Sequence, residues 1–202
     1  MAVALIFETH AVTTDNEAGV ATGWLPGALS PRGRELARAL GERHRGHEVA
    51  AVVVSDLARA VQTAELAFGD RGVPIRTDAR LRECDYGACN GMPVTRLVAE
   101  RSRHLDRPWP GGQSYRQVVA QVDDFLRDLA GAWDGKRVIV IGHSATKWAL
   151  DCLLEGARLE ELLDAPFRWQ EGWRYQVRPA PMGFRRPAPG PGAWGRRCGR
   201  RR

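Results

Sequence analysis

Short apolar runs alternate with longer amphipathic stretches along most of the chain. Aliphatic runs at 3–7, 49–54 and 137–142 are typical of strands that are covered on both faces. A short extended piece is predicted at 73–76, and an edge strand at 175–177. Strands that alternate with helices indicate an α/β protein with a largely parallel sheet.

Helices are predicted where apolar residues recur at helical spacing. The first begins at Ser30 and Pro31, with the serine as N-cap and the proline in the first helical position, and it ends near Arg45. Ser114 is expected to cap a long helix. Further helices are predicted near 57–68, 92–104, 144–154 and 158–164.

Two of the predicted strands end at a histidine that is followed by small residues. His10 follows the run at 3–7, and His143 follows the run at 137–142. In an open α/β sheet, ligands bind just outside the carboxyl ends of the strands. The two histidines are therefore expected to share one site.

Composition limits the class of protein. At 202 residues and 44% hydrophobic content, one domain with a sizeable core is expected. An apolar run of about 18 residues is missing, so no membrane span is predicted. The short apolar start before Glu8 lacks a basic residue, which argues against a secretory signal. The four cysteines show neither zinc spacing nor disulfide density, which favours a reduced cytoplasm.

The net charge of +6 comes from the C-terminal end of the chain. Residues 179–202 contain seven arginines and no acidic residue, and without them 23 basic residues face 24 acidic ones. This stretch of arginine, proline and glycine is predicted to be a disordered tail behind a domain at 1–178. The charge therefore gives no reason to expect nucleic acid or membrane binding by the folded part.

Four segments carry motifs in a fixed order along the chain. They are Thr9-His10-Ala11-Val12-Thr13-Thr14-Asp15-Asn16, the segment from Ser55-Asp56-Leu57 to Thr63-Ala64, Leu81-Arg82-Glu83 with Tyr86-Gly87 and Asn90-Gly91, and Gly142-His143. Together, over about residues 3–178, they resemble the histidine phosphatase superfamily, the phosphoglycerate-mutase-like enzymes. The resemblance implies a three-layer sandwich with a mostly parallel central sheet flanked by helices.

The same resemblance implies a role for each catalytic candidate. His10 would attack phosphorus and become phosphohistidine, and its other ring nitrogen should donate to a backbone carbonyl. Arg59, one turn into a helix, would grip two phosphoryl oxygens, and His143 would complete the oxygen cradle. Glu83 would be the general acid and base, with a pKa raised by the nearby phosphoryl charge.

The chain departs from the family pattern at Thr9. The family has an arginine immediately before the nucleophilic histidine, and that arginine helps to bind the phosphoryl oxygens. Thr9 could offer a hydroxyl donor, while Thr13 and Asn16 match family positions near the phosphate. Candidates to replace the arginine, each of which would otherwise be a surface charge, are Arg76, Arg82 and Lys147.

Other residues are weaker candidates. Three tryptophans are candidates to wall a substrate pocket, although core packing is the commoner role of this residue: Trp24, Trp109 and Trp148. Three histidines lie near predicted helix ends amid charges and are expected to be solvated: His44, His47 and His104. No metal-ligand spacing and no nucleotide-type glycine loop is present, so neither a metal nor another cofactor is expected.

The sequence therefore predicts a phosphatase that acts on a small phosphomonoester without a cofactor. A mutase ranks lower, because residues 84–113 leave little room for the extra segment of the family's mutases. Two alternatives follow from Thr9: a non-catalytic member that binds an anionic ligand or partner, and altered chemistry on a less charged substrate. The basic tail could touch nucleic acid or an anionic membrane by charge alone, and a dispensable extension is the preferred interpretation.

Overall fold

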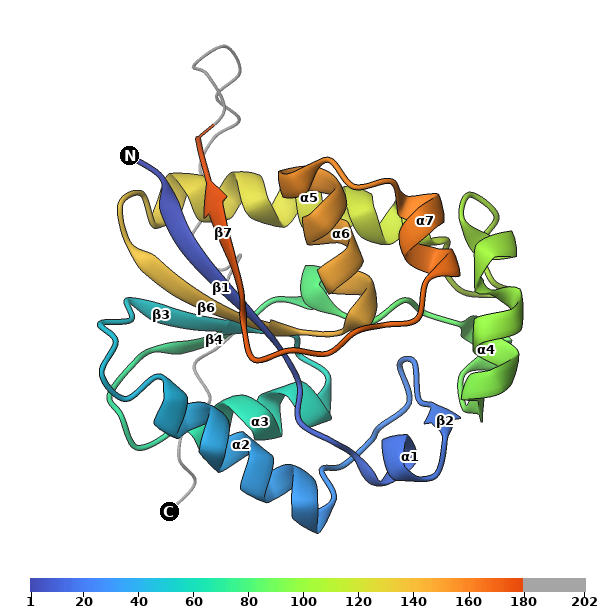
Figure 1. Cartoon of the computed structure of the whole chain (residues 1–202), viewed down its shortest axis with the longest axis horizontal. Helices are drawn as coiled ribbons and strands as arrows, with labels where there is room; N and C mark the ends of the chain where they lie inside the picture. Colours follow the sequence, from blue (N-terminus) through green and yellow to red (C-terminus); the bar gives the residue numbers. More distant parts are fainter. Residues whose placement is uncertain (180–202) are drawn as a thin grey trace.

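Five strands form the central sheet of the computed structural model, in the order β4-β3-β6-β1-β7 (Figure 1). Their bounds are β1 (Val3–Thr9), β3 (Ala51–Val54), β4 (Ile75–Thr77), β6 (Arg137–Gly142) and β7 (Trp173–Val177). The first four in this spatial order are parallel, whereas β7 runs antiparallel along β1. The predicted parallel sheet and the predicted edge strand are confirmed.

The structure describes residues 1–179. The predicted tail at 179–202 lies outside the described residues except for Pro179. Within the described part, no helix is both long enough and apolar enough to cross a membrane.

Helices lie on both faces of the sheet (Figure 1). The α-helices are α1 (Thr14–Glu17), α2 (Pro31–Arg43), α3 (Ala58–Phe68), α4 (Val94–Glu100), α5 (Tyr115–Ala132), α6 (Ser144–Glu155) and α7 (Leu159–Asp164). Short 3-10 helices span Ala79–Leu81, Gly87–Cys89 and Arg101–His104. A separate antiparallel pair consists of β2 (Val20–Ala21) and β5 (Met92–Pro93).

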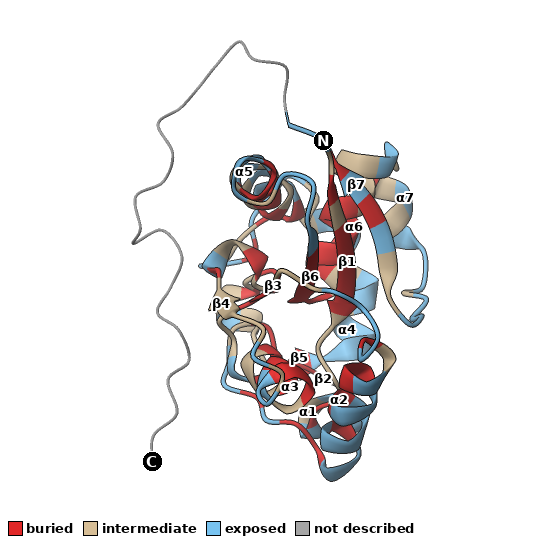
Figure 2. Ribbon diagram, turned by 90° about the vertical axis from the view of Figure 1, so that its left-hand side faces the viewer, coloured by how far each residue is buried: buried red, intermediate tan, exposed pale blue. Residues whose placement is uncertain are grey.

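The buried strands send alternate side chains into two cores. Leu5 and Phe7 of β1 pack in the core beneath α5 and α6, while Ile6 packs with α2 and α3 on the opposite face. The same alternation holds for Val140 and Ile141 of β6. Figure 2 shows the resulting buried sheet between more exposed helices. Continuous apolar strands are the sequence form of a sheet that is covered on both faces.

Local chemistry fixes the starts of the two helices predicted to have a serine cap. The Ser30 hydroxyl accepts from the backbone N–H of Gly33, with Pro31 in the first helical position. Ser114 forms a capping box with Gln117 at the start of α5. Gly33 also lets α2 approach the loop after β1, because a Cβ there would lie 1.8 Å from the Val12 carbonyl oxygen.

Two expectations were wrong. The predicted helix at 92–104 is divided into β5, α4 and a 3-10 helix, because the backbone N–H groups of Gly91 and Val94 bond to β2 and its flanking turn. His44, expected to be solvated, is only 7% exposed. Its Nε2 lies 2.9 Å from the buried carboxylate of Glu8, because the end of α2 packs against β1.

Candidate active site

The register of β1 and β6 places the two histidines at the same rim of the sheet. Thr9 is paired with Gly142, so His10 and His143 are the next residue on each strand. The His10 N–H donates to the Gly142 carbonyl at 3.0 Å, and the two imidazole centroids lie 5.0 Å apart. The prediction that both histidines meet at one edge is confirmed.

Arg59 joins the two histidines from the first turn of α3. Its Nε lies 3.3 Å from His10 Nε2, and its Nη2 lies 3.3 Å from His143 Nδ1 and 2.9 Å from the Gly23 carbonyl oxygen. The side chain is 3% exposed, and its Nη1 is buried without a hydrogen-bond partner in the described part of the chain. A buried guanidinium nitrogen without an acceptor is costly in a protein alone, and an anion would satisfy it.

The hydrogen bonds of His10 determine its tautomer. Nδ1 lies 2.8 Å from the Ala11 carbonyl oxygen, which can only accept, so Nδ1 carries the hydrogen. Nε2 therefore keeps a lone pair on the side of Arg59. Burial, followed by the charge of Arg59, lowers the pKa of His10 to about 3. The ring is neutral near pH 7, as a nucleophile must be.

His143 is also a neutral imidazole in this arrangement. Its Nδ1 accepts from Arg59, so Nε2 donates to the Ser55 hydroxyl at 2.9 Å. Burial lowers the pKa of His143 well below its ordinary value, and the positive charges of Arg59 and of protonated His10 act in the same direction.

Glu83 presents a buried carboxyl group to the same site. One oxygen accepts from the Cys84 N–H at 2.8 Å, and the other accepts from the Ser144 hydroxyl at 3.1 Å. Burial raises the pKa of Glu83 above its usual value, although these hydrogen bonds and the charge of Arg59 act in the opposite direction. Trp24 fixes the segment, because its indole N–H donates to the Glu83 carbonyl at 2.7 Å.

These groups open into a cavity of about 450 Å³. The predicted residues that line it are His10, Asn16, Arg59 and Glu83. Thr13 is fully buried, and its hydroxyl accepts from the Asn16 N–H, while the Asn16 side chain accepts from the Thr13 N–H. The two residues thus cap α1 for each other, and only Asn16 reaches the cavity.

Thr9 does not line the cavity. Its hydroxyl oxygen accepts from the indole Nε1 of Trp169 at 3.2 Å. The three candidates to replace the family's arginine do not line the cavity either. Arg82 binds Asp56 through two contacts of 2.6 Å, Lys147 binds Asp151, and the guanidinium of Arg76 stacks 5.2 Å from the Trp133 ring centroid.

The structure adds residues that the sequence analysis did not single out as functional. Ser55 and Ser144 hold His143 and Glu83, and both follow directly after strands that end at the rim, which is a signal in the sequence. Arg101 lines the cavity without such a signal. Among the three tryptophan candidates, Trp148 lines the cavity, while Trp109 is buried and stacks on His104.

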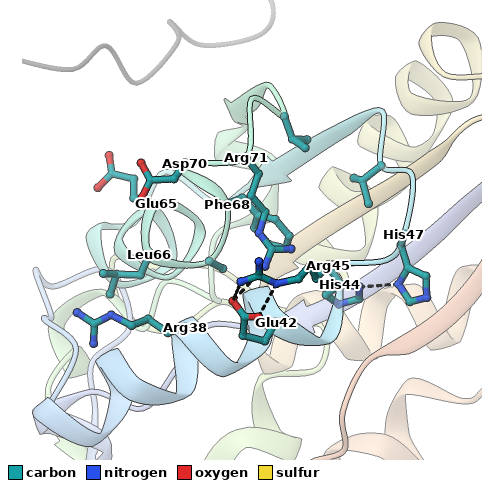
Figure 3. A pocket seen from close by; sticks show the side chains of 13 residues that line it. Arg38, Glu42, His44, Arg45, His47, Glu65, Leu66, Phe68, Asp70 and Arg71 are labelled. Carbon is teal, nitrogen blue, oxygen red and sulfur yellow. Dashed lines mark hydrogen bonds and ion pairs between the residues drawn. The ribbon is translucent and has the colours of Figure 1, made fainter.

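A second, larger hollow of about 760 Å³ lies at the opposite edge of the sheet, where α2 and α3 end (Figure 3). Its arginines face carboxylates of the same hollow, as Arg45 does with Glu42 at 2.5 Å. None of the catalytic or phosphate-binding candidates lies there. Its size alone gives it no chemistry comparable to that around His10.

The comparison with protein families decides the identity of the fold and site. The sequence model of the histidine phosphatase superfamily, branch 1, matches residues 5–176. The chain belongs to this superfamily. Among residues 1–179, no group of three or more histidine, cysteine, aspartate or glutamate side chains is arranged to hold a metal ion.

Relatives within the histidine phosphatases carry phosphatase and mutase names. A Hydrogenobacter thermophilus protein, provisionally named phosphoserine phosphatase 2, is 28% identical over 76% of this chain and 79% of its own. A Salmonella choleraesuis protein, provisionally named phosphoglycerate mutase, is 31% identical over 62% of this chain and 61% of its own. These names support an enzyme of the phosphatase or mutase type.

A solved structure confirms the architecture. Mycobacterial glucosyl-3-phosphoglycerate phosphatase superposes with a TM-score of 0.69 at 25% identity, covering 81% of this chain and 84% of that one. The predicted three-layer fold of the phosphoglycerate-mutase type is therefore confirmed.

Proposed function

We propose that this histidine phosphatase hydrolyses a small phosphomonoester through a phosphohistidine intermediate on His10. The observation that carries the proposal is the pair formed by His10 and Arg59: a neutral imidazole with its lone pair on Nε2, 3.3 Å from a buried guanidinium that still has an unpartnered nitrogen. A nucleophile and an oxyanion ligand are thus held side by side.

In the first step, His10 Nε2 attacks phosphorus and forms a P–N bond while the P–O bond to the alcohol breaks. Glu83 gives its proton to the departing alkoxide, for which its raised pKa suits it. Arg59 binds the phosphoryl oxygens through Nη1. The Nδ1 hydrogen bond to Ala11 keeps the imidazole in the reactive tautomer.

In the second step, the Glu83 carboxylate takes a proton from a water molecule. The water oxygen attacks phosphorus, the P–N bond breaks, and inorganic phosphate leaves with His10 restored to its neutral form. No metal is needed for this sequence, because the imidazole supplies the nucleophile and the carboxyl group moves the protons.

Thr9 supports a second candidate within the same site. With its hydroxyl bonded to Trp169, Arg59 is the single arginine among the motif positions that reaches the cavity near His10. One permanent positive charge suits a phosphorylated substrate that carries less negative charge than a phosphomonoester dianion. Hydrolysis of a monoester remains the preferred proposal, because both histidines, Arg59 and Glu83 are kept.

Incubation with a panel of phosphomonoesters, without added metal, tests the proposal. Phosphate release and a base-stable, acid-labile phosphoryl group on His10 are expected, and both should vanish in His10→Ala. His47→Ala is the matched control, because that histidine is exposed and remote from the site. Neither turnover nor phosphohistidine across a wide panel, with the wild type folded, would contradict hydrolysis and favour a binding role.

A further inference from the structure

Arg101 is a buried cation without a carboxylate partner. It begins the 3-10 helix after α4, it is 5% exposed, and no carboxylate of residues 1–179 lies within ion-pair distance of it. Its Nε donates to the Leu163 carbonyl, and its Nη2 donates to the Ala165 carbonyl at 2.7 Å. Burying a cation without a counter-ion is costly, so the position is one that an anionic ligand would stabilise.

The remaining donors of Arg101 form a fork. The two carbonyls occupy the edge made by Nε and one Nη2 hydrogen, which leaves Nη1 and the second Nη2 hydrogen without a protein acceptor in the described part. The guanidinium lies 5.2 Å from the Trp148 ring centroid, which restricts its plane. Two parallel N–H groups in a fixed plane match the two oxygens of a carboxylate.

Arg101 lines the same cavity as His10 and Arg59. Much of the remaining wall is apolar and comes from α4, α6 and the loop after α7: Val94, Leu97, Val98, Trp148, Pro166 and Phe167. Asp164 also lines the cavity. Its negative charge would oppose a second dianionic phosphate more strongly than a singly charged group.

We propose that Arg101 is a specificity-determining residue that binds a carboxylate on the substrate. The substrate class is then a phosphomonoester with an apolar or aromatic body and a carboxylate remote from the phosphate. This inference rests on the proposed function for its reaction, but its binding step can be measured without turnover.

Paired aryl phosphates test the preference. The kcat/KM for meta- and para-carboxyphenyl phosphate is divided by that for the neutral carbamoyl analogue, in the wild type and in Arg101→Gln. A charge-assisted hydrogen bond predicts that the ratio falls about tenfold in the variant. Arg103→Gln is the matched control, because it makes the same substitution at an exposed position of the same 3-10 helix and should keep the wild-type ratio.

A purely structural role for Arg101, tying the 3-10 helix to the end of α7, would lower both kcat/KM values equally and leave the ratio unchanged. That result would overturn the inference. Because Arg101→Gln could also impair folding, the wild type alone is titrated calorimetrically with benzylphosphonate and with its para-carboxy and para-carbamoyl forms. Tighter binding of the carboxylate is expected, and equal affinities would contradict a carboxylate site.

The two proposals fail in different ways. Absence of turnover with every aryl phosphate, together with a preference for the carboxylated phosphonate that Arg101→Gln removes, would refute hydrolysis and keep the carboxylate site. Turnover with phosphohistidine formation but without any carboxylate preference would do the reverse.

Discussion

The indole Nε1 of Trp169 lies 3.2 Å from the hydroxyl oxygen of Thr9, one residue before His10. This contact joins the end of β1 to the loop between α7 and β7, and Thr9 does not line the cavity. The position at which the family resemblance implies an arginine thus holds a neutral side chain that is already bonded. Arg59 is left to bind the phosphoryl group with the two histidines.

Thr9→Arg should raise activity on ordinary phosphomonoesters. A second cation near the phosphoryl oxygens would add a charge-assisted hydrogen bond of about 1.5–3 kcal/mol, which corresponds to a gain in kcat/KM of about tenfold or more. Steady-state kinetics at two ionic strengths measure the effect. Trp169→Phe is the control, since it removes the indole donor without adding charge. A fall in kcat/KM for Thr9→Arg would show a pocket adapted to a less charged substrate.

Arg59→Gln should remove anion binding. Loss of the donor that faces the phosphoryl oxygens is expected to lower kcat by about 100-fold or more. Inhibition by inorganic phosphate should weaken in parallel, because product and substrate use the same guanidinium. Kinetics with and without added phosphate measure both effects. Arg38→Gln, an exposed change on α2, should behave as the wild type, and near-normal phosphate inhibition in Arg59→Gln would refute the assignment.

Glu83→Gln should separate activity from stability. The amide keeps an acceptor for the Cys84 N–H but cannot move a proton, so kcat should fall by about 100-fold or more. The pKa of Glu83 is raised by burial, so its contribution to stability is fully present below its unfolded pKa and is lost as the pH rises. The variant should therefore gain thermal stability over the wild type as the pH increases from 5 to 7.

Thermal melting across that pH range, with Glu35→Gln as an exposed control on α2, tests the stability of Glu83→Gln. A melting temperature that is lower than that of the wild type at pH 7 would show that the ionised carboxylate is a net stabilising group.

The histidines should make the protein less stable in mild acid. The pKa of His10 is lowered to about 3, so below pH 6.5 the unfolded chain binds a proton that the folded chain does not. Such a group lowers the free energy of unfolding by about 1.4 kcal/mol for each pH unit below 6.5. His10→Ala removes this dependence, so its stability should fall less steeply between pH 6.5 and 5. Urea unfolding at a series of pH values, with His47→Ala as control, measures the slope, and equal slopes would contradict it.

Parts of the site followed from local sequence signals. His10 and His143 were expected at one rim, because each ends a continuous apolar strand and parallel strands end at the same edge. Ser30 and Pro31 marked the start of α2 correctly, because capping is a local interaction. The positions of Arg59 and Glu83 near the histidines were expected from the family motifs, and the structure brings them together.

Other parts depended on contacts that local patterns do not encode. The division of the predicted helix at 92–104 arises from pairing with β2, about 70 residues earlier in the chain. The burial of His44 arises from packing of α2 on the face of β1 that carries Glu8. Neither amphipathic spacing nor residue type distinguishes these partners.

The sequence by itself determined the alternation of buried strands and helices, the rim that collects the two histidines, and the neutral residue at Thr9. These features are set by hydrophobic periodicity and by the identity of single residues. Tertiary structure decided that Thr9 meets Trp169, 160 residues away, and that Arg101 alone among the nearby arginines of its segment lines the cavity. The physical reason is that a side chain's charge and donors are fixed by its residue type, whereas its partners depend on which distant segments the packed sheet brings to the same rim.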